Sequence, residues 1–198
     1  MSVSAKTALV LGCGGVAGAA WSIAVLEQVE KQLGWDALDA DILIGTSAGA
    51  VLAALLSAGV PVSQLVDCER GSSSQCRWNH DVDSGPALPP RPALAFTAAA
   101  LLGKGLRGEV SALTALTGVL PQGRADMAPF MHLINSVVSE GEWSTHAAAW
   151  MMAVDAHSGE RVALGRDVQM PMNAAVCARS EEHTSELQSP DQLVCRLP

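Results

Sequence analysis

The stretch Asp41-Ile42-Leu43-Ile44-Gly45-Thr46-Ser47-Ala48-Gly49 decides how this chain folds. Its first four residues form a short apolar run with β-branched side chains, which predicts a buried strand, and the apolar residues 50–58 after it predict a helix. Residues 45–49 have the form Gly-x-Ser-x-Gly. Glycine is needed on both sides because side chains there would collide with the neighbouring elements when a strand reverses into a helix. The pattern predicts a nucleophile elbow, with Ser47 strained and its hydroxyl exposed.

A simpler interpretation competes with the elbow. A buried turn of glycine, serine and alanine can serve only to let a helix pack closely, without any chemistry at the serine. The predicted strand before residues 45–49 and the predicted helix after them favour the elbow.

A second glycine-rich loop lies near the N-terminus. Residues 7–11 predict a buried strand, residues 12–18 are rich in glycine, and an apolar helix follows through residues 21–26. Backbone N–H groups of such a loop at a helix N-terminus form a pocket for negative charge. The loop therefore predicts a site for a phosphate or an oxyanion.

The phosphate interpretation is the weaker one. The pattern Gly12-x-Gly14-x-x-Ala17 fits a dinucleotide fingerprint, which also requires an acidic residue at the end of the second strand. Here Asp39 and Asp41 precede that strand. The two loops make better sense together: the first supplies amide donors, and the second supplies the serine whose attack on an ester creates an oxyanion.

These features resemble the patatin-like phospholipase family. The resemblance is strong over residues 7–60, weak over 70–145 and moderate over 146–178, and it rests on the loop 12–18, the helix 21–26, the turn 34–36, the strand 41–44, the motif 45–49, and residues 153–156 and 158–162. Two departures are Cys13, which replaces a glycine, and Ala17, where many members carry arginine. We expect Cys13 to be buried and inert.

The resemblance implies both a fold and a site. The fold is a three-layer α/β/α arrangement with a mainly parallel central sheet, here incomplete at its C-terminal side. The implied activity is hydrolysis of lipid acyl esters by a serine–aspartate dyad through an acyl-enzyme. The implied site consists of the nucleophile Ser47, oxyanion donors Gly14 and Gly15, elbow residues Gly45, Thr46, Ala48 and Gly49, and loop residues Gly12, Cys13 and Gly18.

The dyad aspartate is the missing part. In the family it is followed by glycine, and no aspartate of this sequence is. A Ser-Asp-His triad using Asp155 and His157 has the right order but poor spacing, since both side chains would share one face of a strand. Residues 179–198 resemble a translated sequencing adapter, so we expect a patatin-like domain at 1–178, a non-native tail at 179–198, and almost no activity.

Composition limits which classes of partner and which cellular compartment the sequence favours. With 198 residues, 49% of them hydrophobic, the chain is long enough for one α/β domain. A net charge of −8 and the lack of a basic run argue against nucleic acid and against strong attraction to anionic lipid. Five irregularly spaced cysteines favour a reduced, cytoplasmic setting. We expect an acyl-ester or lipid substrate, peripheral membrane contact, no cofactor and no metal site.

A membrane hairpin is the competing arrangement, because residues 7–26 and 42–66 carry no charge and are each long enough to span a bilayer. Their glycine clusters and strand-like beginnings favour buried strands with covering helices instead. The alternative function is accordingly a non-catalytic or membrane-associated binding domain.

The remaining sequence predicts a loop, three helices and a hairpin. The loop covers residues 71–92, and the helices cover 93–102, 110–120 and 129–138, with residues 103–105 separating the first two. Residues 145–154 and 161–164 predict two strands joined by a turn at 156–159.

Overall fold

A four-stranded mixed sheet forms the centre of the protein. The computed structural model describes residues 6–72, 100–116, 127–155 and 160–180. The strands lie side by side in chain order, as β1 (Ala8–Leu11), β2 (Ile42–Gly45), β3 (Ala149–Val154) and β4 (Arg161–Leu164). Strands β1, β2 and β3 are parallel, and β4 runs antiparallel to β3. The predicted mainly parallel sheet is confirmed.

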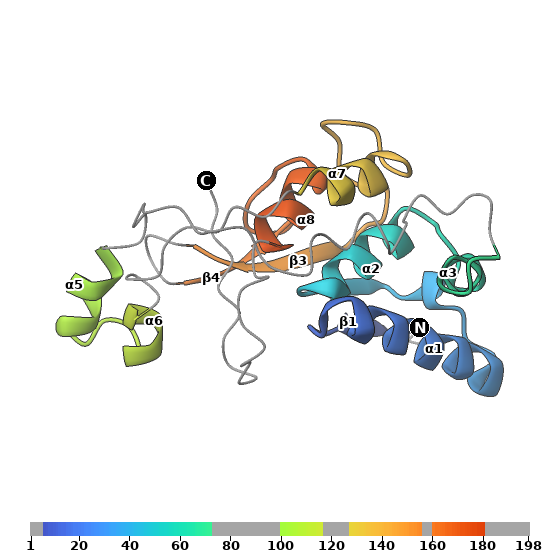
Figure 1. Ribbon diagram of the computed structural model, residues 1–198, viewed down its shortest axis with the longest axis horizontal. Helices are drawn as coiled ribbons and strands as arrows, with labels where there is room; N and C mark the ends of the chain where they lie inside the picture. Colours follow the sequence, from blue (N-terminus) through green and yellow to red (C-terminus); the bar gives the residue numbers. More distant parts are fainter. Residues whose placement is uncertain (1–5, 73–99, 117–126, 156–159, 181–198) are drawn as a thin grey trace, which may run out of the picture.

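Helices connect and cover these strands. Figure 1 shows α7 and α8 above β3 and α1 along the lower edge of the molecule. The helical elements are α1 (Gly15–Leu33), the 3-10 turn η1 (Ala37–Asp39), α2 (Ala48–Ser57), α3 (Val62–Glu69), α5 (Ala100–Leu106), α6 (Ala112–Leu116), α7 (Ala128–Asn135) and α8 (Met172–Ser180). This arrangement confirms the expected α/β class, and it is that of an α/β/α fold.

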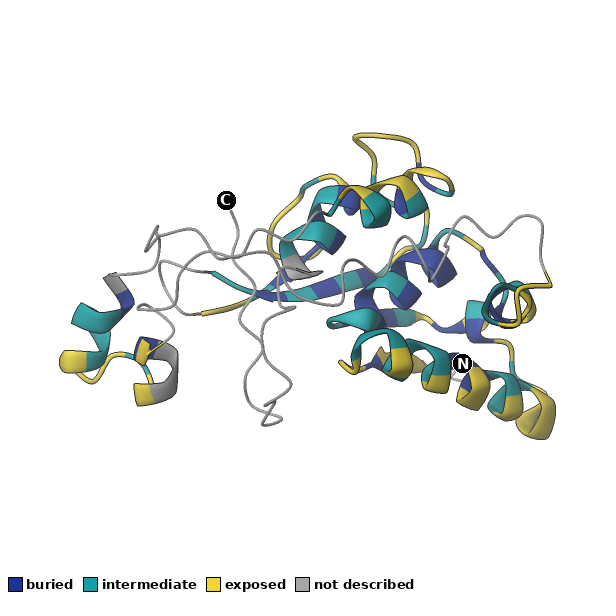
Figure 2. Ribbon diagram, viewed as in Figure 1, coloured by how far each residue is buried: buried dark blue, intermediate teal, exposed yellow. Residues whose placement is uncertain are grey.

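Helix α2 is the centre of the hydrophobic core. It packs against strands β1, β2 and β3 and against helices α1, α7 and α8. Its residues are small or aliphatic and almost all are buried, which is why it can lie within the molecule without an unpaired charge. Leu43, Met151 and Leu164 from the sheet belong to the same core cluster and are fully buried. Figure 2 shows this burial along α2 and β3, whereas α1 alternates between half-buried and exposed residues.

Strand β1 differs from the expectation of a buried strand. It pairs with β2 on one side and stands at the edge of the sheet that the described residues form. Its residues alternate between the core and solvent: Leu11 is buried, and Val10 is 66% exposed. The strand is half-exposed because it lies at the edge of the sheet, and its own residues do not encode that position.

The second half of the chain corrects several predicted boundaries. Residues 103–105, expected to separate two helices, lie inside α5, and the second of these helices covers only Ala112–Leu116 in the described part. Strand β3 begins at Ala149, four residues later than predicted, while β4 has the predicted bounds. Helix α3, which was not predicted, occupies part of the charge-free stretch 42–66. The predicted loop 71–92 lies almost entirely outside the described residues.

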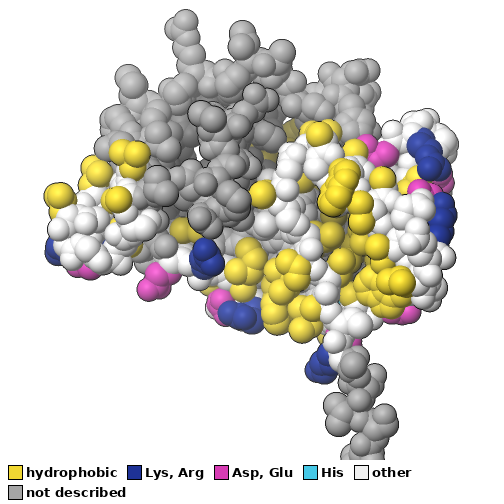
Figure 3. Space-filling model, turned by 90° about the horizontal axis from the view of Figure 1, so that it is seen from below, with side chains coloured by type: hydrophobic (Ala, Val, Ile, Leu, Met, Phe, Trp, Pro, Cys, Tyr) yellow, Lys and Arg dark blue, Asp and Glu magenta, His cyan; other side chains and the backbone are white. Residues whose placement is uncertain are grey.

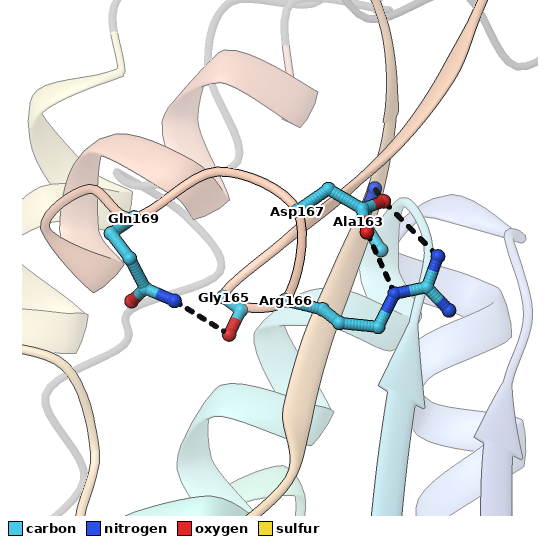
Figure 4. Close-up of polar contacts among 5 residues, drawn as sticks. All are labelled: Ala163, Gly165, Arg166, Asp167 and Gln169. Carbon is cyan, nitrogen blue, oxygen red and sulfur yellow. Dashed lines mark hydrogen bonds and ion pairs between the residues drawn. The ribbon is translucent and has the colours of Figure 1, made fainter.

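The connection from β4 to α8 is held by a compact polar cluster (Figure 4). Asp167 accepts a hydrogen bond from the Ala163 amide and forms an ion pair with Arg166, whose Nε lies 2.8 Å from Oδ1. The Arg166 hydrogen bond, followed by the Ala163 amide, lowers the pKa of Asp167, and the same ion pair raises the pKa of Arg166. The guanidinium also lies over the Trp150 ring, 5.2 Å from its centroid.

Candidate active site

The backbone of Ser47 is strained in the way the sequence predicted. Ser47 has φ 52 and ψ −137 and stands between the end of β2 and the first turn of α2. Among the described residues it is the one non-glycine with positive φ. Such a conformation costs on the order of 1–3 kcal/mol and persists only where the surroundings impose it. With this conformation the chain changes direction from strand to helix at a single residue, and Ser47 lies at the turn.

The glycines on either side are required by close backbone contacts. A Cβ at Gly45 would overlap the Ala50 backbone and the Gly49 carbonyl oxygen. A Cβ at Gly49 would overlap the carbonyl oxygens of Leu11, the last residue of β1, and of Gly12, the first residue of the other glycine loop. Both glycines are buried. These contacts explain the glycines by sterics, as the sequence argument required.

The two glycine loops touch each other. The Thr46 amide donates to the Leu11 carbonyl at 3.0 Å, and the Gly49 amide donates to the Gly12 carbonyl at 3.1 Å. These two hydrogen bonds lie on either side of Ser47. They follow from the register, because Leu11 pairs with Gly45 and both parallel strands therefore end at the same edge of the sheet. The structure thus brings the two predicted loops together.

The first loop presents backbone amides at a helix N-terminus. Gly14 precedes the first turn of α1, and its carbonyl accepts from the Gly18 amide at 2.8 Å. A Cβ at Gly14 would lie 2.7 Å from the Gly18 Cα, so the turn is too tight for a side chain there. Gly15 has φ +59, which favours glycine. The first amides of a helix have no intrahelical acceptor, so those of Gly14 and Gly15 are suited to bind negative charge.

Solvent reaches both loops. Gly12, Cys13 and Gly14 are exposed, and Ser47 is half-buried. Within the described part of the chain, the Ser47 hydroxyl makes no hydrogen bond. The expectation that Cys13 is buried is wrong: its thiol is free and exposed, because the loop leaves the sheet before α1 covers it.

A general base for Ser47 is not supplied by the described aspartates. Asp155 follows the carboxyl end of β3, which is the correct edge of the sheet. It lies four residues beyond Met151, the partner of Gly45, and therefore roughly 13 Å further along the strand direction. Asp41 lies at the opposite end of β2 and accepts from the Thr7 amide at 2.8 Å. His157 lies outside the described residues.

Other ionisable groups near the sheet have structural roles. His146 is half-buried and bridges two backbone groups: its Nε2 lies 2.8 Å from the Ala40 carbonyl, and its Nδ1 accepts from the Ala148 amide at 3.1 Å. No cluster of three metal-ligating side chains occurs within residues 6–72, 100–116, 127–155 and 160–180. In the same ranges, no helix combines the length and the apolar content needed to cross a bilayer.

Comparison with known proteins identifies one family. The model of the patatin-like phospholipase family matches residues 9–128, more than half of the chain, and this range contains both glycine loops and Ser47. No curated protein and no solved structure matches the chain.

Proposed function

Because the chain belongs to the patatin-like phospholipase family, we propose that its site is that of a serine hydrolase acting on carboxylic esters of lipid acyl chains. The observation that carries the proposal is the conformation of Ser47, with φ 52, between one hydrogen bond to the end of β1 and one to the first glycine loop. Strain at a serine on a strand-to-helix turn is characteristic of a hydroxyl held for nucleophilic attack.

The proposed reaction has two halves. The Ser47 Oγ attacks the ester carbonyl carbon, the C–O bond to the leaving alcohol breaks, and an acyl-Ser47 ester forms. Water then attacks this ester, releasing the fatty acid and restoring the hydroxyl. In each half the carbonyl oxygen becomes an oxyanion, to which the amides of Gly14 and Gly15 would donate. The N-terminus of α2, which begins at Ala48, adds favourable electrostatics beside the nucleophile.

The general base in this proposal is an aspartate that the described residues do not provide. We assign the patatin-like domain to residues 1–178 and regard residues 179–198 as foreign to it. Loss of a base typically lowers the rate by several powers of ten, while oxyanion donors and binding retain roughly 10³–10⁴-fold catalysis over water. The 198-residue chain should therefore turn over esters very slowly.

The proposed partners follow from the family and the composition. The substrate is a lipid or another acyl ester, met through peripheral contact with a lipid surface, and the reaction requires no cofactor. Nucleic acid is disfavoured by the net charge of −8. We propose a reducing, cytoplasmic compartment, which is supported by the free and exposed thiol of Cys13.

A fluorophosphonate probe tests the nucleophile directly, because the probe reacts with an activated serine and needs no deacylation. We expect slow but specific labelling that is abolished by Ser47→Ala and retained in Ser63→Ala, whose serine is exposed on α3. Peptide mass spectrometry should locate the adduct on residue 47. Equal labelling of wild type and Ser47→Ala would refute the assignment.

A non-catalytic binding domain is the second candidate. It is favoured by one observation, that no described carboxylate forms a hydrogen bond with Ser47. On this hypothesis the glycines serve only close packing of α2 on β1. The wild type would then stay unlabelled at probe concentrations and times that label the family's active members, while its folding would still depend on Gly45 and Gly49.

A further inference from the structure

Helix α1 carries an apolar face that points to solvent. Its exposed residues in the first three turns follow the helical repeat and are all apolar, namely Ala17, Trp21, Ala24 and Val25. Trp21 is 68% exposed and Val25 is 36% exposed. We call these four residues the α1 apolar face. A soluble surface helix normally places charged or polar residues on its exposed side, so this face is unusual.

The inner side of α1 already has its partners. Ile23 and Leu26 are buried in the core, and the helix packs against α2 and α3. The α1 apolar face is therefore the side that the described chain does not use. Figure 3 views the molecule from the side on which α1 lies in Figure 1, and there hydrophobic side chains gather in the middle of the surface with charged groups at its margins.

Charge indicates which partner this face fits. The first charged residue of α1 is Glu27, which forms an ion pair with Lys31 at 2.7 Å on the last turns of the helix. The face itself has no cation that could bind a phosphate, and the whole chain has a net charge of −8. A surface of anionic lipid is disfavoured by this charge, whereas a zwitterionic lipid surface is not.

The location of the face connects it to the candidate site. Helix α1 begins at Gly15, directly after the glycine loop that contacts the elbow. Trp21 is six residues further on, roughly 9 Å along the helix axis. A lipid surface in contact with Trp21 would thus present its esters close to the mouth of the site. Tryptophan suits this position because its ring is apolar and its N–H is polar, as at membrane interfaces.

We propose that the α1 apolar face, centred on Trp21, docks the protein on a zwitterionic lipid surface beside the candidate active site. As regards the kind of partner, this inference rests on the proposed function. The binding itself requires no turnover, so it can be tested separately from hydrolysis.

Sedimentation with phosphatidylcholine vesicles tests the proposal on the full 198-residue chain. We expect wild type and Ser47→Ala to partition equally, and Trp21→Gln to bind at least tenfold more weakly, which corresponds to about 1.4 kcal/mol. The matched control is Leu106→Gln on α5, which removes a side chain that is 91% exposed at the other end of the molecule. The control should bind within about twofold of wild type. Circular dichroism and thermal melts establish that each variant is folded.

Any of the following results would overturn the proposal. The first is that wild type does not bind phosphatidylcholine vesicles, or that Trp21→Gln binds them as wild type does. The second is that added phosphatidylserine strengthens binding, which would point to a basic surface elsewhere. The third is that sedimentation velocity shows a wild-type dimer which Trp21→Gln dissociates without changing vesicle binding, since the face would then join two copies of the chain. Loss of vesicle binding in Ser47→Ala as well would assign the lipid contact to the site rather than to α1.

Discussion

The substitution Gly49→Ala tests whether the two glycine loops are held in contact. Gly49 is the second residue of α2, and helix propensity alone predicts that alanine there stabilises the protein by about 1 kcal/mol. The structure predicts the opposite sign, because the new Cβ would overlap the carbonyl oxygens of Leu11 and Gly12. Overpacking of this kind costs roughly 1–3 kcal/mol, and loss of the hydrogen bond from Gly49 to Gly12 adds about 1 kcal/mol. We expect a net loss of about 1–3 kcal/mol after the gain in propensity.

Gly12→Ala is the matched control for this experiment. Gly12 lies in the other loop of the same contact, but a Cβ built on it meets nothing within 4 Å and its φ lies outside the left-handed region that favours glycine. It should change the free energy of unfolding by less than about 0.5 kcal/mol. Thermal unfolding measures both variants, and for a domain of this size the expected loss in Gly49→Ala lowers Tm by roughly 2–12 °C. If Gly49→Ala melts at or above the temperature of Gly12→Ala, the loops are not in contact as described.

Three further changes have expected outcomes. Ser47→Gly relieves the positive φ of residue 47 and should raise the free energy of unfolding by about 1 kcal/mol, which is measured as a higher urea midpoint. A lower midpoint would argue against strain there. Gly165→Ala should cost about 2–4 kcal/mol, because φ is +90 and a Cβ would overlap the Trp143 ring; unchanged urea unfolding would contradict this packing. The lowered pKa of Asp167 stabilises the fold above its ordinary value of 3.8, and this contribution is lost as the pH falls through the folded value. The difference in urea midpoint between wild type and Asp167→Asn should therefore be full at neutral pH and shrink as the pH falls below 3.8, and a constant difference would exclude the ion pair with Arg166 as the cause.

Local sterics made two features predictable, because they depend on residues close in the chain. Gly45 must lack a side chain for β2 to turn into α2, and Gly34 ends α1 with φ 61. The pairing of β1 with β2 followed from two strands linked by one helix, which favours parallel neighbours. These features need no knowledge of the rest of the fold.

Features that depend on distant parts of the chain were harder to predict. The exposure of Val10 depends on β1 standing at an edge of the sheet, and that of Cys13 depends on where the loop leaves the sheet. Helix α5 continues through Gly103 and Gly105 because tertiary packing against α6 outweighs the low helix propensity of glycine. The apolar residues of α1 predicted a helix but not which of them face solvent. The signal for the α1 apolar face was present in the spacing of Ala17, Trp21 and Val25, although the same spacing also fits a buried side.

The central claim is that the Ser47 hydroxyl and the amides of the first glycine loop serve one reacting carbonyl. A crystal structure of the chain after reaction with a fluorophosphonate measures this most directly, because the phosphonyl oxygen stands in for the oxyanion. The account predicts an adduct on Ser47 whose phosphonyl oxygen lies about 2.7–3.1 Å from the amide nitrogen of Gly14 or Gly15. An adduct on Ser47 with that oxygen directed into solvent, beyond hydrogen-bond reach of both amides, would contradict it.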